Sequence, residues 1–309
     1  MQHTALFNEG FLMQMKQVVI PAAGYGTRFL PYTKAVCKEL VPLIDKPIIH
    51  HIVQEAVLSG FTSVNIVINQ RKNAVQKYFT HDAALTHLLQ HDHKEHLIAD
   101  IQNLINQASF NFFMQEEQHG VADALMQALP QSGADFFGVM YPDDVVFGAK
   151  PALLQLAELA QEKQATIIAV TEVPQEKISA YGVIAPKEWL SDSVCRVDRI
   201  IEKPLAHQAP SQWAIIGRFV LSPTILPVLD QCRQQDGPAF LFTDALERLA
   251  HTEAVYAYRV EGTRHDTGTP EGWLASIIDY ASRSERYAHA VHLQQCKTIQ
   301  LDQTISLLL

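Results

Sequence analysis

The residues with the clearest chemical potential follow the first apolar run of the chain. Gly24 and Gly26 form a G-x-G turn, and three cations come soon after them: Arg28, Lys34 and Lys38. Glycines let backbone N–H groups approach a polyphosphate, while Arg offers forked donors and Lys a compact charge. A G-x-G alone is equally typical of a plain tight turn, so it is the cations that favour binding of a phosphorylated ligand.

Two other nucleotide-binding motifs are absent from the sequence. The third glycine of a dinucleotide fingerprint is missing because position 29 is Phe, and no G-x-x-x-x-G-K-[ST] segment occurs. These absences count against a dehydrogenase and exclude a P-loop.

One carboxylate stands where a metal ion could bind. Asp143 follows an apolar run that we expect to form a strand. Parallel sheets bind their ligands at the carboxyl ends of the strands, which is where Asp143 would lie. Mg²⁺ is usually held by one or two carboxylates together with substrate phosphates. A turn or helix cap is the alternative interpretation of such an Asp.

The cationic segment also carries a family resemblance. Residues 24–34 read G-x-G-T-R-x-L-P-x-T-K and residues 38–42 read K-E-L-V-P. This pattern resembles the signature of bacterial nucleotidyltransferases that activate sugar 1-phosphates, above all the UTP–glucose-1-phosphate uridylyltransferases. Further segments resemble later motifs of that family in the same order: Q-H-G-V-A-D-A-L at 118–125, M-Y-P-D-D at 140–144 for the family's L-P-D-D, A-Y-G-V at 180–183, E-K-P at 202–204, G-R-F-V-L at 217–221, T-D-A at 243–245 and H-D-T-G at 265–268.

The resemblance implies transfer of a uridylyl group from UTP to glucose 1-phosphate, with release of pyrophosphate. A phosphate monoester has a second pKa near 6 and is largely ionised at pH 7, so this reaction needs no general base and no covalent intermediate. The protein has to hold two anions in line and neutralise charge on the departing group. The resemblance therefore also implies Mg²⁺ as cofactor.

The resemblance assigns a role to each matching residue. Catalytic roles fall to Arg28, Lys38 and Lys203, and metal binding to Asp143 and Asp266, with Asp144 as an outer partner. The nucleotide site would contain Ala22, Ala23, Gly24, Gly26, Thr27, Arg28, Glu39, Gln118 and Gly120. The sugar-phosphate site would contain Gly182, Glu202, Lys203 and Gly217. The Gln118 amide can accept from uracil N3–H and donate to a ring carbonyl.

Departures from the family pattern leave two alternatives open. Cys37 replaces a Pro, residues 120–124 read G-V-A-D-A for G-L-G-H-A, and residues 239–244 read A-F-L-F-T-D for E-I-Q-L-T-D. One alternative is a relative that uses dTTP, ATP or another sugar 1-phosphate. The other is a catalytically inactive nucleotide-binding regulatory protein, although the retained charged residues argue against it.

The elements that would position these residues alternate between strands and helices. Apolar, β-branched runs predict strands at 16–23, 63–69, 111–114, 135–141 and 166–173, and helical patterns cover 47–59, 73–106, a segment from about 120, and 151–163. This alternation predicts an α/β fold, with a Rossmann-like, mostly parallel central sheet flanked by helices. Strand patterns at 181–186, 197–203, 213–221 and 254–262 predict an added β-rich part, to which the resemblance assigns the sugar.

We divide the chain into three parts. Residues 1–14 are expected to be a flexible extension, 15–283 the catalytic domain, and 284–309 a helical tail. The helical pattern of this tail starts at Ser282, just before the boundary. The apolar end of that tail would dock on its own domain or on a partner subunit. Because similar enzymes form dimers or tetramers, we expect a homo-oligomer.

Composition limits the class of protein. The 309 residues are 48% hydrophobic and carry a net charge of −9, which excludes a disordered chain and disfavours a nucleic-acid partner. Four widely spaced cysteines, no long apolar run and no signal-peptide pattern indicate a cytoplasmic protein without a membrane span. The His-rich stretch 81–96 could suggest a metal site, but a solvated helix face is the favoured interpretation.

Overall fold

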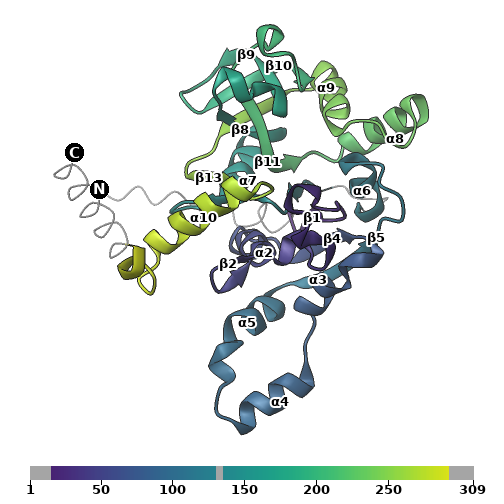
Figure 1. The fold of residues 1–309 in the computed structure, drawn as a ribbon. Coiled ribbons are helices and arrows are strands. Elements are labelled where there is room, and N and C mark those ends of the chain that lie inside the picture. Colours follow the sequence, from purple (N-terminus) through teal and green to yellow (C-terminus); the bar gives the residue numbers. More distant parts are fainter. Residues whose placement is uncertain (1–14, 130–134, 292–309) are drawn as a thin grey trace, which may run out of the picture.

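A single central sheet organises the chain (Figure 1). The computed structural model describes residues 15–129 and 135–291. Within them, nine strands form one sheet in the order β5-β4-β1-β6-β11-β8-β12-β10-β9. Their bounds are β1 Gln17–Pro21, β4 Ser63–Ile68, β5 Ser109–Met114, β6 Phe137–Met140, β8 Thr166–Glu172, β9 Gly182–Trp189, β10 Val194–Glu202, β11 Trp213–Leu221 and β12 Val255–Arg259.

The sheet has two halves of different character. Strands β5, β4, β1 and β6 pair in parallel, and we call them the parallel half. Strand β11 runs antiparallel to both β6 and β8. Beyond it, β12 is parallel to β8, while β10 is antiparallel to β12 and β9; β11, β8, β12, β10 and β9 form the mixed half.

The α/β fold class is confirmed, and one detail is corrected: the mostly parallel arrangement holds only for the parallel half. The added β-rich part is an extension of the same sheet through β11. A run of apolar residues indicates that a strand is buried, whereas the direction of the strand depends on its connections. The sequence pattern therefore did not distinguish parallel from antiparallel strands.

Helices cover both faces of the sheet, as expected. They are α2 Ile48–Leu58, α3 Asn73–Tyr78, α4 Ala83–His91, α5 Ala99–Gln107, α6 Val121–Ala128, α7 Ala152–Lys163, α8 Ile225–Asp236, α9 Phe242–Thr252 and α10 Pro270–Arg283. The continuous helical pattern predicted for 73–106 is wrong, because three helices share this stretch. Asp82 starts α4 by accepting a hydrogen bond from the Leu85 amide at 2.9 Å, and His93 follows α4 with a positive φ of 54°. Of the helical tail predicted for 284–309, the described part is helical at 288–291. Residues 292–309 lie outside the described residues, as does the predicted extension 1–14.

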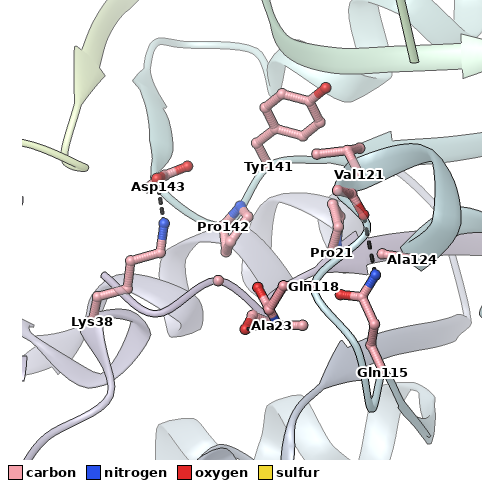
Figure 2. A pocket seen from close by; sticks show the side chains of 12 residues that line it. Pro21, Ala23, Lys38, Gln115, Gln118, Val121, Ala124, Tyr141, Pro142 and Asp143 are labelled. Carbon is pink, nitrogen blue, oxygen red and sulfur yellow. Dashed lines mark hydrogen bonds and ion pairs between the residues drawn. The ribbon is translucent and has the colours of Figure 1, made fainter. Parts of the chain in front are cut away.

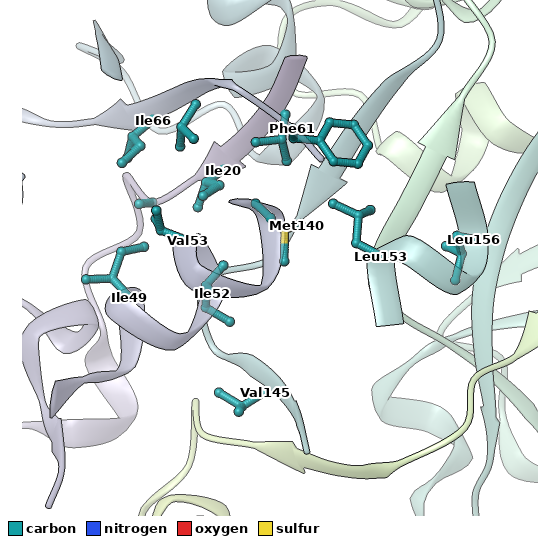
Figure 3. Close-up of a cluster of buried hydrophobic side chains, with 14 of the residues drawn as sticks. Ile20, Ile49, Ile52, Val53, Phe61, Ile66, Met140, Val145, Leu153 and Leu156 are labelled. Atoms are coloured by element: carbon teal, nitrogen blue, oxygen red, sulfur yellow. The ribbon is translucent and has the colours of Figure 1, made fainter. Parts of the chain in front are cut away.

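Alternate residues of the parallel strands feed two separate cores. Val18 and Ile20 of β1 pack against α2 and α7, as Figure 3 shows for Ile20, Ile52 and Leu153. Val19 belongs to the opposite layer, which contains residues of α6, α8 and α9. Successive side chains of a strand point to opposite faces, so a strand covered on both sides has to be apolar throughout.

The His-rich stretch belongs to an excursion that extends away from the sheet at the bottom of Figure 1. No residue of α4 is buried. Among the described residues, no three His, Cys, Asp or Glu side chains are grouped so that they could hold a metal ion. This arrangement fits the solvated interpretation. Separately, none of the helices in the described ranges has the length and apolar character needed to cross a membrane.

Candidate functional site

A cavity of about 250 Å³ opens at the carboxyl ends of β1 and β6, where sheets of this kind bind ligands (Figure 2). Three segments line it: the loop after β1, the segment that leads into α6, and the turn after β6. The lining residues are Pro21, Ala23, Gly24, Lys38, Gln115, Gln118, Gly120, Val121, Ala124, Tyr141, Pro142 and Asp143. Several predicted nucleotide residues and one predicted metal ligand therefore meet here.

The loop after β1 presents backbone rather than side chains. A Cβ built on Gly24 would meet no atom within 4 Å, so the surface at this residue is open. Gly26 has a φ of +67°, and a Cβ there would lie 3.0 Å from the Lys38 Cβ. Conformation and space both require glycine at position 26. The loop is further fixed by Thr33, whose hydroxyl donates to the Gly26 carbonyl at 2.8 Å.

Two glutamines define the opposite wall. The Gln118 amide donates to the Ala23 carbonyl at 3.0 Å, which joins the predicted base-recognition loop to the glycine loop. Gln115, which the sequence analysis missed, donates to the Asp123 carboxylate at 2.7 Å and to the Gly120 carbonyl, the latter drawn in Figure 2. Asp123 thus has a structural partner in the loop where this chain departs from the family pattern.

A buried ion pair lies behind the glycine loop. Glu39 is 1% exposed, and its Oε1 accepts from the Lys72 ammonium at 2.6 Å. Lys72 also donates to the Ala22 carbonyl, so one ammonium ties Glu39 to the loop. Burial raises the pKa of Glu39 and lowers the pKa of Lys72, while their mutual attraction opposes both shifts. Lys72 was missed because no motif marks it.

The Oε2 atom of Glu39 is buried and, among the described residues, has no hydrogen-bond partner. A buried acceptor without a partner is costly, so this atom is available to a donor on a ligand. Glu39 is nevertheless not among the residues that line the cavity. Its predicted role in nucleotide binding therefore depends on this one oxygen.

Lys38 and Asp143 form an ion pair of 2.6 Å between Nζ and Oδ2 across the cavity (Figure 2). Burial works to raise the pKa of Asp143, but Lys38 and its hydrogen bond outweigh it and hold that pKa below its usual range. Burial likewise works to lower the pKa of Lys38, and Asp143 and Glu39 raise it overall. Arg28 is exposed, yet its charge acts on both residues.

The two predicted metal ligands converge. Strands β7 (Asp144–Phe147) and β13 (Thr263–Asp266) pair with Asp144 opposite Asp266. A Cβ built on Gly268 would lie 2.8 Å from Asp143 Oδ2 and 3.0 Å from Asp266 Oδ1, so both carboxylates border one glycine. Burial raises the pKa of Asp266; Arg264 opposes this shift and Asp143 adds to it.

Two repelling carboxylates beside this cavity suit Mg²⁺, because this hard cation takes one or two carboxylates and completes its shell with phosphate oxygens and water. The donor set therefore fits the metal that the resemblance implies. The Lys38 ammonium lies beside the same site and pairs with Asp143.

Asp144 holds β11 and Arg264 in place through its two carboxylate oxygens. Its Oδ2 accepts from the Gly217 amide at 2.7 Å, and its Oδ1 accepts from the Arg264 guanidinium at 2.6 Å. Arg264 also donates to the Tyr181 hydroxyl at 3.3 Å. Asp144 and Arg264 thus connect the metal-binding turn to the strands expected to meet the sugar. Arg264 was missed because this contact is far apart in the sequence.

Among the predicted sugar-phosphate residues, Gly182 begins β9, Glu202 ends β10 and is followed by Lys203, and Gly217 lies in the middle of β11. A Cβ on Gly182 would come within 3.1 Å of Glu202 Oε2, so glycine leaves room for that carboxylate. The Lys203 side chain is 62% exposed, and its Nζ lies 3.4 Å from Glu202 Oε1. The backbone of Lys203 has a positive φ of 45°. Lys203 is therefore not brought into the cavity with Lys38.

Comparisons with known proteins agree on one family, the nucleotidyl transferases. Residues 17–283 match the family model described as nucleotidyl transferase. A UTP–glucose-1-phosphate uridylyltransferase of Mycoplasma pneumoniae is 35% identical over 274 residues, which is 88% of this chain and 94% of that relative.

Two solved structures are similar over most of their length. A UTP-bound UGPase of Acinetobacter baumannii has a TM-score of 0.82 and 30% identity, with 93% of this chain and 99% of that one covered. A UDP-glucose pyrophosphorylase complexed with UDP-glucose has a TM-score of 0.79 and 34% identity, with coverages of 87% and 100%.

Proposed function

Because the chain belongs to the nucleotidyl transferase family, we propose that it transfers the uridylyl group of UTP to glucose 1-phosphate and releases pyrophosphate. The observation that carries this proposal is the cavity itself, with a glycine loop and Lys38 on one side and the Asp143 turn on the other. It supports a site that holds a polyphosphate beside a cation and a carboxylate. The names of the similar proteins supply the two substrates.

In the proposed reaction, a phosphate oxygen of glucose 1-phosphate attacks the α-phosphorus of UTP in line with the departing pyrophosphate. The attacking oxygen is already ionised near neutral pH, so the protein's task is positioning and charge neutralisation. Open backbone at Gly24 would receive phosphate oxygens. Lys38 and the exposed Arg28 would neutralise the triphosphate as charge moves to the leaving group.

Asp143 and Asp266 would hold Mg²⁺, which supplies positive charge to the phosphates of both substrates. Lys38 forms an ion pair with Asp143 in the structure. With Mg²⁺ held by the two carboxylates, the Lys38 ammonium would be free for a phosphate oxygen.

Base and sugar would bind on opposite sides of that charged centre. Gln118 and Gly120 would face the uracil, with the free oxygen of Glu39 as an additional acceptor. Gly182, Glu202 and Gly217 would surround the hexose. Lys203 would bind the sugar's phosphate after moving from solvent.

We also propose a cytoplasmic homo-oligomer, a dimer or a tetramer. Cys37, Cys195 and Cys232 are free thiols in the structure, in line with a reducing compartment. Light scattering coupled to size-exclusion chromatography tests the oligomeric state.

The deciding assay measures pyrophosphate release from UTP and glucose 1-phosphate with and without Mg²⁺. We expect turnover with the metal and none after chelation, with dTTP, ATP and other sugar 1-phosphates as comparison substrates. Preference for one of those substrates would overturn the choice of substrate. UTP binding without turnover of any pair would instead identify a regulatory protein.

A further inference from the structure

Tyr141 is a part of the cavity to which no role has been given. It follows β6 directly and lines the cavity between Asp143 and Val121 (Figure 2). The family pattern that this chain resembles has Leu at the corresponding position. A phenol here adds a polar group to a wall that would otherwise be apolar.

The backbone and ring of Tyr141 are held firmly against β11. Its amide donates to the Gly217 carbonyl at 2.8 Å, and its own carbonyl accepts from Arg218 at 3.4 Å. A Cβ on Gly217 would lie only 2.5 Å from the Tyr141 Cβ and 2.7 Å from its Cγ, so the ring begins directly over the glycine. The ring also packs against Phe219, with centroids 5.6 Å apart. These contacts fix where the hydroxyl can lie.

The Tyr141 hydroxyl lacks a protein partner: among the described residues, no hydrogen bond to it is formed. Tyr181, the nearby tyrosine, has its hydroxyl occupied by Arg264. A phenol has an unperturbed pKa of about 10, so this hydroxyl is protonated and able to donate near neutral pH.

The neighbours of the ring indicate which part of the substrates Tyr141 meets. Gly217 lies beneath the start of the ring, and Gly217 belongs to the proposed sugar side. Gln118, on the proposed uracil side, instead extends from the segment before α6 toward Ala23.

We propose that the Tyr141 hydroxyl donates a hydrogen bond to a hydroxyl group of the hexose and thereby contributes to selection of the sugar 1-phosphate. This inference rests on the proposed function and deepens it. A donor placed by Gly217 and Phe219 pairs with a sugar hydroxyl at no cost in protein rearrangement. A leucine at this position could make only apolar contact.

The test compares Tyr141→Phe, which removes only the hydroxyl, with the wild type on glucose 1-phosphate and on its monodeoxy analogues. For Tyr141→Phe we expect kcat/KM for glucose 1-phosphate to fall about tenfold, a loss typical of one uncharged hydrogen bond. One monodeoxy analogue should show the same loss with the wild type, and no further loss with the variant. The KM for UTP should stay unchanged. Tyr256→Phe, on β12 outside the cavity, is the matched control.

Several outcomes separate this inference from the proposed function. An active wild type with an unaffected Tyr141→Phe overturns the inference alone, as does a loss that appears with 2′-deoxy-UTP rather than with a deoxy sugar. If the wild type uses a different sugar 1-phosphate, the proposed substrate is wrong, and a tenfold loss by Tyr141→Phe on that sugar still supports the inference. A wild type inactive with every pair overturns both.

Discussion

The two halves of the sheet prepare their parts of the site differently. In the parallel half, the ion pair behind the glycine loop is almost fully buried, with side-chain exposures of 5% for Lys72 and 0% for Glu39. In the mixed half, Lys203 is 62% exposed and lies 3.4 Å from Glu202. The proposed nucleotide side is therefore shaped before any ligand arrives, whereas the sugar side keeps its cation in solvent.

The difference follows from what each side chain does. A buried charge has to be paired, so Lys72 and Glu39 hold one geometry and fix the loop between them. An exposed lysine retains its conformational freedom and loses it only on binding, which lowers affinity. We therefore expect the nucleotide to bind to a preformed site and the sugar phosphate to order Lys203 as it binds.

Asp143 lies at the seam between the halves, so its loss should have the largest effect. Asp143→Asn removes a charge from the proposed metal site, and we expect kcat to fall about 10³-fold, as for loss of a group that stabilises transition-state charge. Steady-state assays across a Mg²⁺ titration measure the change. Asp198→Asn, an exposed position on β10, is the control. Near-normal activity of Asp143→Asn would remove Asp143 from the metal site.

Lys72→Met tests whether the parallel half is preformed. It leaves the Glu39 carboxylate buried without its partner, so the free energy of unfolding should fall by about 3 kcal/mol. Urea unfolding measures this loss, and Lys77→Met on the exposed face of α3 should be nearly neutral. The double variant Lys72→Met, Glu39→Gln should recover part of the stability. Equal losses in the single and double variants would mean that the pair does not act as a unit.

Lys203→Ala tests the mixed half. Because Lys203 is exposed and its carboxylate contact is long, we expect an unchanged melting temperature. The KM for glucose 1-phosphate should rise about tenfold while the KM for UTP stays constant, as for loss of a charged hydrogen bond. Lys187→Ala, exposed on β9, serves as control. An unchanged KM for the sugar phosphate would exclude Lys203 from the site.

Acid should weaken the parallel half first. Burial lowers the pKa of His50 to about 4 and that of His51 to about 3, and both lie on α2. Between these values and about 6.5 the unfolded chain binds protons that the folded protein excludes. Stability is therefore complete above about pH 6.5 and is lost as the pH falls, by up to about 1.4 kcal/mol per pH unit for each histidine.

Hydrogen exchange at pH 7 and pH 5 measures this acid effect segment by segment. We expect α2 to lose protection before β9 and β10 do. His51→Leu should reduce the pH dependence of the melting temperature, and an unchanged slope would contradict the assignment.

Local features of the fold could be predicted from the sequence. The strand predicted at Ser63–Asn69 is β4, and the helix predicted at 47–59 is α2. Both could be predicted because the apolar residues that they bury recur at regular spacing within a short segment. The direction of β11 could not be predicted, since it depends on how the chain returns to the centre of the sheet after β9 and β10. The sequence predicted one helical stretch at 73–106 because its amphipathic pattern continues throughout. Single capping residues such as Asp82 divide this stretch into three helices without changing the pattern.

The site divides in the same way. Residues predicted from a motif, such as Gly24, Lys38 and Asp143, lie together around one cavity. Lys72 and Arg264 were missed because each acts through a partner distant in the chain: Glu39 for the first and Asp144 for the second. A single sequence carries no signal for such pairs.

The central place of β11 has a consequence for synthesis on the ribosome. Strand β11 lies between β6 and β8, but it leaves the ribosome after both of them. Until Leu221 has emerged, the edge of β6 that faces away from β1 has no partner strand. The edge of β8 that will pair with β11 is also open. Open strand edges pair readily with other chains. The interval between completion of β8 and arrival of β11 is thus the time at which the nascent chain is most exposed to aggregation.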